Sequence, residues 1–252
     1  MTVNPAAAHG FSAGADAYDR GRPSYPITAV DHIVKELGLA AGRRVVDLGA
    51  GTGKFTELLV GSGAEVIAVE PVAEMRAKLE AALPGVSALA GTSEAIPVAD
   101  ATADAVVAAQ AFHWFDPGRA VPEIVRVLHP GGGLALLWNQ RDESVPWVKE
   151  LSKVTRWTAE APYARDADWA AVVAGAARGR ITPLHLTSFP YEQLVDREML
   201  LDRVRSISYL AAGPSEELDV ILADVLDLVW EFPERFVLPY RTDVWIGHLI
   251  PA

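Results

Sequence analysis

The sequence predicts an α/β protein with a doubly wound, Rossmann-like and mostly parallel sheet. Short apolar runs at residues 44–48, 65–70 and 105–109 alternate with segments of helical periodicity. Polar residues do not alternate with apolar ones inside these runs, which is typical of strands covered on both faces. A glycine-rich turn at residues 49–53 follows the first run, and a strand, a glycine turn and a helix in this order are typical of a nucleotide-binding half-fold.

The elements follow one another at short, regular intervals as far as Trp138. Helices are expected at 27–39, 54–61, 71–83, with Pro71 in the first turn, and 116–128. Strands are expected at 44–48, 65–70, 86–90, 105–109 and 134–138, the last one after a break at 130–133.

The pattern changes after Trp138. Helical segments are expected at 144–180, 197–211 and 218–229, and strands at 184–191 and 236–246. We therefore expect a single domain over residues 1–252, in which residues 144–235 form a helical insert and cap elements over the substrate pocket. Residues 1–26 contain little periodicity and several aromatic residues and prolines, and are expected to form an amino-terminal arm or lid.

Composition narrows the class of protein. Half of the 252 residues are hydrophobic, but no apolar stretch approaches the ~20 residues that cross a bilayer. The amino terminus lacks the layout of a secretory signal, so a cytoplasmic protein is expected. There is no cysteine, and the six histidines show no paired spacing, so neither a disulfide nor a metal site is expected.

The acidic net charge of the chain indicates which kinds of partner it can bind. The formal net charge is −11, from 33 acidic and 22 basic residues. Such a surface repels phosphate backbones, so a nucleic-acid partner is disfavoured and a small-molecule substrate is expected. No membrane partner is expected, and the oligomeric state is expected to be a monomer or a homodimer.

Two ligands compete for the glycine turn, a nicotinamide dinucleotide and S-adenosylmethionine. Glu70 ends the second strand, 17 residues beyond Gly53, where a carboxylate can accept from the hydroxyls of a ribose. The spacing Gly49-x-Gly51-x-Gly53 differs from the dinucleotide pattern. Asp47 precedes the turn, where its charge would oppose two phosphates but suits the ammonium and sulfonium groups of the methyl donor. The charge argument favours S-adenosylmethionine.

Four segments resemble the class I S-adenosylmethionine-dependent methyltransferases. Residues 45–53 (VVDLGAGTG) are similar to the first motif of that family, and residues 66–71 (VIAVEP) with Met75 to the second. Residues 91–97 (GTSEAIP) resemble the segment that contacts the adenine. Residues 108–116 (AAQAFHWFD) resemble a small-molecule branch that includes trans-aconitate methyltransferase-like proteins.

The resemblance covers residues 11–142 well and the rest loosely. It implies a seven-stranded sheet with an antiparallel last strand. It also implies methyl transfer from S-adenosyl-L-methionine, with S-adenosyl-L-homocysteine as the product.

The resemblance also implies which residues hold the cofactor. They are Asp47, Gly49, Ala50, Gly51, Glu70, Pro71, Met75, Thr92, Ser93 and Gln110. Many relatives have an aspartate where Thr92 stands. A hydroxyl can accept one hydrogen bond but adds no charge. In the arm, Tyr18 and Arg22 resemble the segment that closes over the methionine end, and Arg22 could pair with the carboxylate of the donor.

Residues near the ends of the later strands are expected to meet the acceptor. His113 lies in an aromatic loop where the reacting atom is expected, either as a general base or as a contact. Trp138 and Arg141 are expected to line the substrate pocket, and most other tryptophans to be core. The acceptor atom is expected to be an oxygen of a carboxylate, phenol or enol. The alternatives are an NAD-linked oxidoreductase and a non-enzymatic S-adenosylmethionine-binding regulatory protein.

Overall fold

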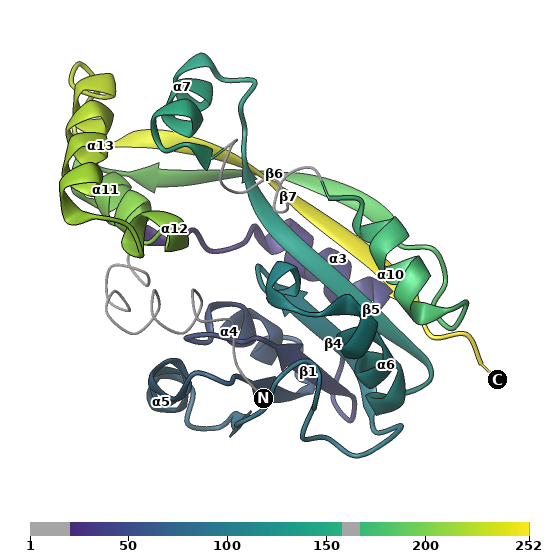
Figure 1. The fold of residues 1–252 in the computed structure, drawn as a ribbon. Coiled ribbons are helices and arrows are strands. Elements are labelled where there is room, and N and C mark those ends of the chain that lie inside the picture. The colour runs from purple at the N-terminus through teal and green to yellow at the C-terminus, as the bar shows by residue number, and fades with distance from the viewer. Residues whose placement is uncertain (1–20, 158–166, 252) are drawn as a thin grey trace. The chain divides into compact units, whose positions relative to one another are not determined.

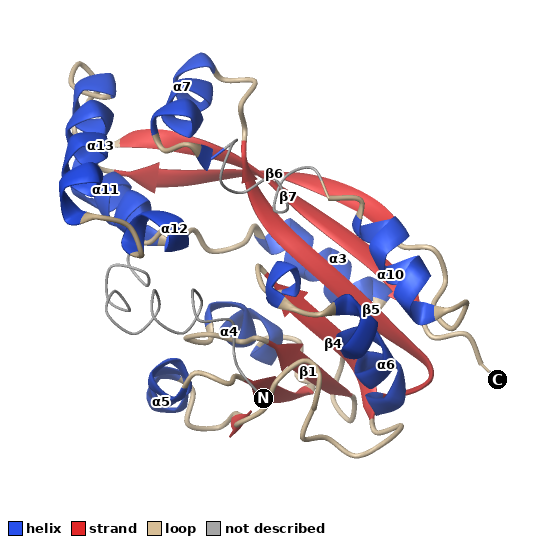
Figure 2. Ribbon diagram, in the orientation of Figure 1, coloured by secondary structure: helices blue, strands red, loops and turns tan. Residues whose placement is uncertain are grey.

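The computed structural model describes residues 21–157 and 167–251 of the chain. Its seven strands form one sheet in the order β3-β2-β1-β4-β5-β7-β6. Figure 2 draws the strands in red and the helices in blue. The strands are β1 (Arg44–Leu48), β2 (Glu65–Val69), β3 (Ser87–Leu89), β4 (Ala103–Ala109), β5 (Leu128–Arg141), β6 (His185–Val195) and β7 (Phe236–His248). The pairs β3–β2, β2–β1, β1–β4 and β4–β5 are parallel. The last strand of the chain, β7, runs antiparallel, so the predicted mixed sheet is confirmed.

The helices fall into an early group and a late group along the chain (Figure 1). The early group is α3 (Ile27–Glu36), α4 (Lys54–Val60), α5 (Ala73–Ala82) and α6 (Pro117–Val127), with a short 3-10 helix, η1, at Phe112–Trp114. The late group is α7 (Pro146–Val154), α10 (Trp169–Ala177), α11 (Arg197–Arg205), α12 (Ser208–Ala211) and α13 (Ser215–Leu228). None of the helices in the described part of the chain is long and apolar enough to cross a membrane.

The chain divides into two compact units. Unit 2 consists of residues 25–138, 168–189 and 242–252. Unit 1 consists, among the described residues, of 21–24, 139–157, 167 and 190–241. Strands β5, β6 and β7 contribute residues to both units. Helix α10, which falls inside the predicted insert, belongs to unit 2.

Unit 2 holds the parallel strands and their core. Val45 and Val46 are neighbours on β1, point to opposite faces of the sheet, and are both fully buried. The same is true of Ala105 and Val106 on β4. Burial of successive residues confirms that both faces are covered, as the unmixed apolar runs predicted. One of the two layers comes from α3 and α4, and α10 packs beside α6.

Unit 1 has a core of its own, in which α7, α11 and α13 pack together. Most of the buried residues in this core are leucines and valines. They come from these helices and from the parts of β6 and β7 that belong to the unit. Helix α13 lies where a helical segment was expected at 218–229, and it buries Ile221, Leu222 and Val225. The prediction of a helix in this region is therefore confirmed.

Three sequence expectations about element boundaries were wrong. Helix α5 begins at Ala73, after Val72 as the N-cap, so Pro71 precedes the helix; the Val72 N–H donates instead to the carboxylate of Glu70. Residues 128–133 belong to β5, because a register shift against β4 absorbs the glycines. The helix expected at 197–211 is two helices, which are separated at residues 206–207.

Candidate cofactor and active site

The glycine loop connects β1 to α4 in unit 2. Gly49 and Gly51 have φ angles of +76° and +59°, which only glycine adopts readily. The N–H groups of Gly49 and Ala50 donate to the carbonyl of Val69 at 2.8 and 3.2 Å, which ties the loop to the end of β2. A Cβ on Gly51 would meet only the Sδ of Met75, at 3.9 Å. The loop therefore exposes backbone at Gly51 to a ligand and places Met75 beside it.

Glu70 lies directly after β2 and faces the loop. Its Oε2 accepts from the Gly51 N–H and its Oε1 from the Val72 N–H, both at 2.8 Å. The side chain is buried, and this burial raises the pKa of the carboxyl against the opposing effect of the two N–H groups. A carboxylate has about four lone-pair sites. Each oxygen of Glu70 therefore retains the capacity to accept from a ribose hydroxyl.

Asp47 is the last polar residue of β1 before the loop and is completely buried. Its Oδ2 accepts from the hydroxyl of Thr56 on α4 at 2.6 Å, whereas Oδ1 has no hydrogen-bond partner. Burial raises the pKa of Asp47 to about 7, and the nearby charge of Glu70 adds to this rise. A buried acceptor without a donor is costly. An ammonium group would provide the missing donor, so Asp47 fits the methyl donor.

The segment after β3 carries the predicted adenine contacts. Thr92 pairs with Ala95 in a short bridge, and its buried hydroxyl lies beside the carboxylate of Glu94. Ser93 donates to Glu94 at 2.7 Å. Burial raises the pKa of Glu94, but hydrogen bonds from Ser93 and the Asp116 N–H outweigh it, so the net pKa is lowered. The hydroxyl and carboxylate oxygens of this segment can accept from an adenine amino group, and its contact with adenine stays a prediction.

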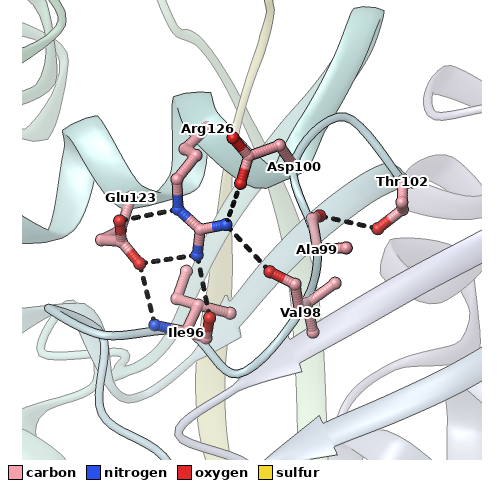
Figure 3. Close-up of polar contacts among 7 residues, drawn as sticks. All are labelled: Ile96, Val98, Ala99, Asp100, Thr102, Glu123 and Arg126. Atoms are coloured by element: carbon pink, nitrogen blue, oxygen red, sulfur yellow. Dashed lines mark hydrogen bonds and ion pairs between the residues drawn. The ribbon is translucent and has the colours of Figure 1, made fainter.

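A charged network anchors the loop that follows this segment (Figure 3). Arg126 on α6 donates to Glu123 and Asp100, and to the carbonyls of Ile96 and Val98, at 2.6–2.9 Å. Glu123 in turn accepts from the Ile96 N–H at 3.0 Å. One guanidinium therefore holds residues 96–100 against α6.

We expect Arg126→Met to lower the free energy of unfolding by ~2 kcal/mol, because it leaves two loop carbonyls and two carboxylates without their charged donor. For a protein of this size that loss corresponds to a fall in Tm of about 4–8 °C. Calorimetry on the variant measures it. Arg119→Met, an exposed arginine on the same helix, is the matched control. An equal Tm for the two variants would contradict the anchoring role.

The segment between β4 and α6 packs directly on the glycine loop. A Cβ on Gly49 would lie 2.7 Å from the Cβ of Ala111 and 3.5 Å from the ring of Phe115. Gln110 has a φ of +53°, a conformation that side chains other than glycine rarely adopt. Its N–H donates to the Leu137 carbonyl at 2.9 Å. Strained backbone of this kind is concentrated at functional sites.

His113 lies in η1, and its ring is oriented by Trp138. The Nε1–H of Trp138 donates to Nδ1 of His113 at 3.2 Å. An indole nitrogen can only donate, so Nδ1 is the acceptor and the neutral imidazole carries its proton on Nε2. In this arrangement the ring presents an N–H donor. A general base needs an unprotonated nitrogen instead.

Trp138 belongs to an aromatic cluster. It is 1% exposed and stacks on Trp169 of α10 with ring centroids 4.7 Å apart and an interplanar angle of 5°. Phe112 meets Trp169 edge-on at 5.6 Å and Phe115 at 5.5 Å. The expectation that Trp169 is a core residue is confirmed. The same stack gives Trp138 a fixed position from which it orients His113.

The remaining predicted residues lie elsewhere in the chain. Arg22 and Arg141 are residues of unit 1; Nη2 of Arg22 donates to the Ser206 carbonyl at 3.0 Å. Tyr18 lies outside the described residues, as does most of the predicted arm. Within residues 21–157 and 167–251, no group of His, Asp and Glu side chains could hold a metal ion.

Sequence reasoning missed Thr56 and Phe115. Thr56 donates to Asp47 from the first turn of α4, and Phe115 touches the glycine loop. The sequence contains one indication of Thr56. It is a polar residue between the apolar Phe55 and Leu59, on a helix that packs against the sheet. Phe115 gave no signal beyond membership of an aromatic loop.

Comparisons with known proteins agree with this geometry. The family model described as a methyltransferase domain matches residues 46–136. The uncharacterized methyltransferase Rv3342 of Mycobacterium tuberculosis is 42% identical over 243 residues, with 92% of each chain covered. The malonyl-[acyl-carrier protein] O-methyltransferase of Methylococcus capsulatus is 37% identical over 138 residues, which cover 50% of this chain and 48% of that protein.

A solved structure of a protein from Anaeromyxobacter dehalogenans has the same fold. Its TM-score is 0.61 at 24% identity, and the match covers 92% of this chain and 99% of that one. The trans-aconitate-like branch stays a prediction, and nothing in the comparisons favours an oxidoreductase. The chain belongs to the class I methyltransferases and is an S-adenosylmethionine-dependent enzyme.

Proposed function

We propose that this methyltransferase methylates an oxygen atom of a small molecule, a carboxylate, phenol or enol. The observation that carries the proposal is the close approach of Ala111 and Phe115 to the glycine loop at Gly49. His113, whose ring is oriented by Trp138, lies between these two residues in the segment, and we place the donor on the glycine loop. An oriented N–H donor beside an activated methyl group suits an oxygen acceptor, which can accept that hydrogen bond.

In this proposal some residues bind the methyl donor and others shape the surroundings of His113. When bound, S-adenosylmethionine would supply a methyl group activated by its sulfonium, for in-line displacement by the ionised oxygen of the acceptor, with S-adenosylhomocysteine as the leaving group. A carboxylate is already ionised, whereas a phenol or enol first loses its proton to solvent. Glu70 holds the ribose, and Asp47 pairs with the ammonium of the methionyl end. The aromatic cluster of Phe112, Trp138 and Trp169 excludes water from one side of His113.

Two further observations support an oxygen of a small acceptor. The net charge of −11 opposes docking of a nucleic acid. The relative from Methylococcus capsulatus is by name a malonyl-[acyl-carrier protein] O-methyltransferase, which supports oxygen as the accepting atom. A carboxylate needs no base, because it is already ionised at neutral pH. This agrees with an imidazole at position 113 that donates rather than accepts.

We expect His113→Gln to lower kcat/KM for the acceptor by about tenfold, chiefly through KM, because one oriented hydrogen bond of ~1.4 kcal/mol is weakened. A glutamine amide can still accept from Trp138. Steady-state kinetics between pH 6 and 9 measure the effect. A general base would instead show a loss of roughly 10²–10⁴-fold in turnover and of the acidic limb of the pH profile. That outcome would contradict the role of a contact.

Turnover of donor labelled in the methyl group tests the proposed acceptor class. The wild-type enzyme is incubated with separate pools of carboxylic acids, phenols, enolisable ketones, amines and nucleic acid. We expect the label to enter methyl esters or ethers of the first three pools. Label confined to amines or nucleic acid would overturn the proposal, and reactions without acceptor give the background.

A further inference from the structure

Thr56 connects the two sides of the glycine loop by a side-chain hydrogen bond. It lies in the first turn of α4, directly after the loop, and is completely buried. Its hydroxyl donates at 2.6 Å to Oδ2 of Asp47, which lies on β1 before the loop. The two residues are nine positions apart in the chain. The bond therefore fixes the start of α4 against the end of β1 on either side of the loop.

The bond has the length of a charge-assisted hydrogen bond. Bonds from a hydroxyl to an ionised oxygen measure about 2.5–2.7 Å and are roughly twice as strong as those between neutral groups. An ionised carboxylate can only accept, so the hydroxyl of Thr56 must donate to it. A threonine hydroxyl in a helix often donates instead to the carbonyl four residues earlier. The donation to Asp47 therefore stabilises the ionised carboxylate and fixes its rotamer.

The other surroundings of Asp47 do not favour a charge. Its partners across the sheet are the apolar Ala68 of β2 and Val107 of β4. Within residues 21–157 and 167–251, its Oδ1 has no hydrogen-bond partner. Burial raises the pKa of Asp47 to about 7, the hydrogen bond from Thr56 opposes this rise, and the charge of Glu70 adds to it. The hydroxyl thus counteracts both unfavourable effects.

Packing alone does not explain a hydroxyl at position 56. The other buried residues of α4, Phe55 and Leu59, are apolar, and of its charged residues Lys54 is half-buried and Glu57 is exposed. Valine has almost the same shape as threonine and would fill this space without a polar group. A buried hydroxyl is costly unless it is hydrogen-bonded. The position of Thr56 therefore indicates a role for its hydroxyl rather than for its volume.

We propose that Thr56 is a positioning residue for the methyl donor, whose hydroxyl keeps the Asp47 carboxylate ionised and oriented for the ammonium group of the donor. This inference rests on the proposed function, in which Asp47 pairs with that ammonium. Thr56 acts through the carboxylate and not by contact with the cofactor. Without the hydroxyl, ionisation of Asp47 becomes more costly, and binding of the donor must offset that cost.

Thr56→Val removes the hydroxyl and keeps the size of the side chain. We expect it to weaken binding of S-adenosylhomocysteine at pH 7 by about tenfold or more, because a charge-assisted hydrogen bond is lost. Binding requires the ionised carboxylate, so affinity falls as the pH drops below the pKa of Asp47. In the variant this fall should begin at least about one pH unit higher. Calorimetric titration between pH 6 and 8 measures both effects.

Thr56→Ser and Thr56→Ala form a matched pair that lacks the same methyl group and differs in the hydroxyl. The serine variant should bind S-adenosylhomocysteine nearly as well as the wild type, and the alanine variant as weakly as Thr56→Val. This comparison holds even if Thr56→Val does not fold. A role in packing predicts the reverse order, in which the valine variant binds like the wild type and the serine variant is as weak as the alanine variant. That order would overturn the inference.

Asp47→Asn distinguishes failure of this inference from failure of the function on which it rests. The asparagine carries no charge, so adding Thr56→Val to it should change the affinity about twofold or less. If Asp47→Asn loses affinity but Thr56→Val has the same effect with either residue at position 47, the positioning role alone is overturned. Wild-type affinity in Asp47→Asn would overturn the pairing of Asp47 with the ammonium as well.

Discussion

Asp47→Asn is expected to stabilise the ligand-free enzyme at pH 8 by up to ~4 kcal/mol, and at the same time to remove most of its affinity for the cofactor. The side chain is fully buried and its pKa is raised from 3.8 to about 7. Each pKa unit corresponds to about 1.4 kcal/mol. Because the native state binds this proton more tightly than the unfolded state, stability falls as the pH rises from about 4 to about 7. Above about pH 7 the native state carries the full cost of the ionised, buried Asp47.

Asparagine removes the cost of burying an ionised carboxylate and keeps the hydrogen bond from Thr56. Its amide oxygen can still accept from Thr56, which now donates to Asp47 at 2.6 Å. The neutral side chain no longer repels Glu70, but it also no longer attracts the ammonium of the donor. The gain in unfolding free energy should therefore be largest at pH 8 and nearly absent at pH 4. We propose that the destabilising carboxylate is retained at this position because cofactor binding requires its charge.

Urea unfolding at several pH values, with calorimetric titration of S-adenosylhomocysteine, measures both effects. Asp104→Asn is the contrasting control. The pKa of Asp104 is lowered to about 2, because hydrogen bonds from the Arg44 N–H, Arg43 and His129 outweigh burial. Its stabilising effect is lost as the pH falls from about 4 to about 2, so the control variant should lose stability at pH 8. A destabilised Asp47→Asn with unchanged cofactor affinity would refute the assigned role.

Glu70→Ala is expected to weaken binding of S-adenosylhomocysteine by about 10²–10⁴-fold. The change removes charge-assisted hydrogen bonds to both ribose hydroxyls, each of ~1.5–3 kcal/mol. It also releases the Gly51 and Val72 N–H groups, which hold the loop to the end of β2. The shift in melting temperature that the ligand causes should therefore largely disappear.

The matched control is Glu74→Ala, which removes an exposed carboxylate from α5, close in sequence to Glu70. It should bind S-adenosylhomocysteine like the wild type. Circular dichroism and urea unfolding establish that the Glu70 variant is folded before binding is compared. A wild-type ligand-induced shift in Glu70→Ala would place the cofactor elsewhere.

The sequence predicted those parts of the site that are close together along the chain. Asp47 lies near the end of β1, Gly49 and Gly51 lie in the loop directly after it, and a parallel neighbour brings Glu70 to the same edge of the sheet. These positions follow from strand period and topology, because adjacent parallel strands end on the same side. The doubly wound sheet was predictable for the same reason.

Contacts between distant residues were not predictable in this way. The hydrogen bond from Trp138 to His113 spans 25 residues, and the stack of Trp138 on Trp169 joins a strand to a helix of the later region. Side-chain rotamers and the packing of α10 beside α6 decide such contacts, and neither leaves a periodic signal. Buried Arg203 likewise resembles a surface residue in the sequence, because arginine is rarely buried without a partner.

The predicted start of helix α5 was wrong because a side chain accepts a hydrogen bond from the backbone there. Pro71 suggested the first turn of a helix, but the carboxylate of Glu70 accepts from Val72, so α5 begins at Ala73. A local hydrogen bond of this kind depends on the rotamer of Glu70, which the sequence does not specify. The displaced boundary is therefore a consequence of the site itself.

A crystal structure of the enzyme with S-adenosylhomocysteine tests the central claim most directly. We predict that the ribose hydroxyls donate to Glu70, that the ammonium lies at Oδ1 of Asp47, and that the adenine lies between Met75 and the Thr92–Ser93 segment. The sulfur should then face His113. A ligand bound outside the glycine loop, or a ribose that does not contact Glu70, would contradict the account.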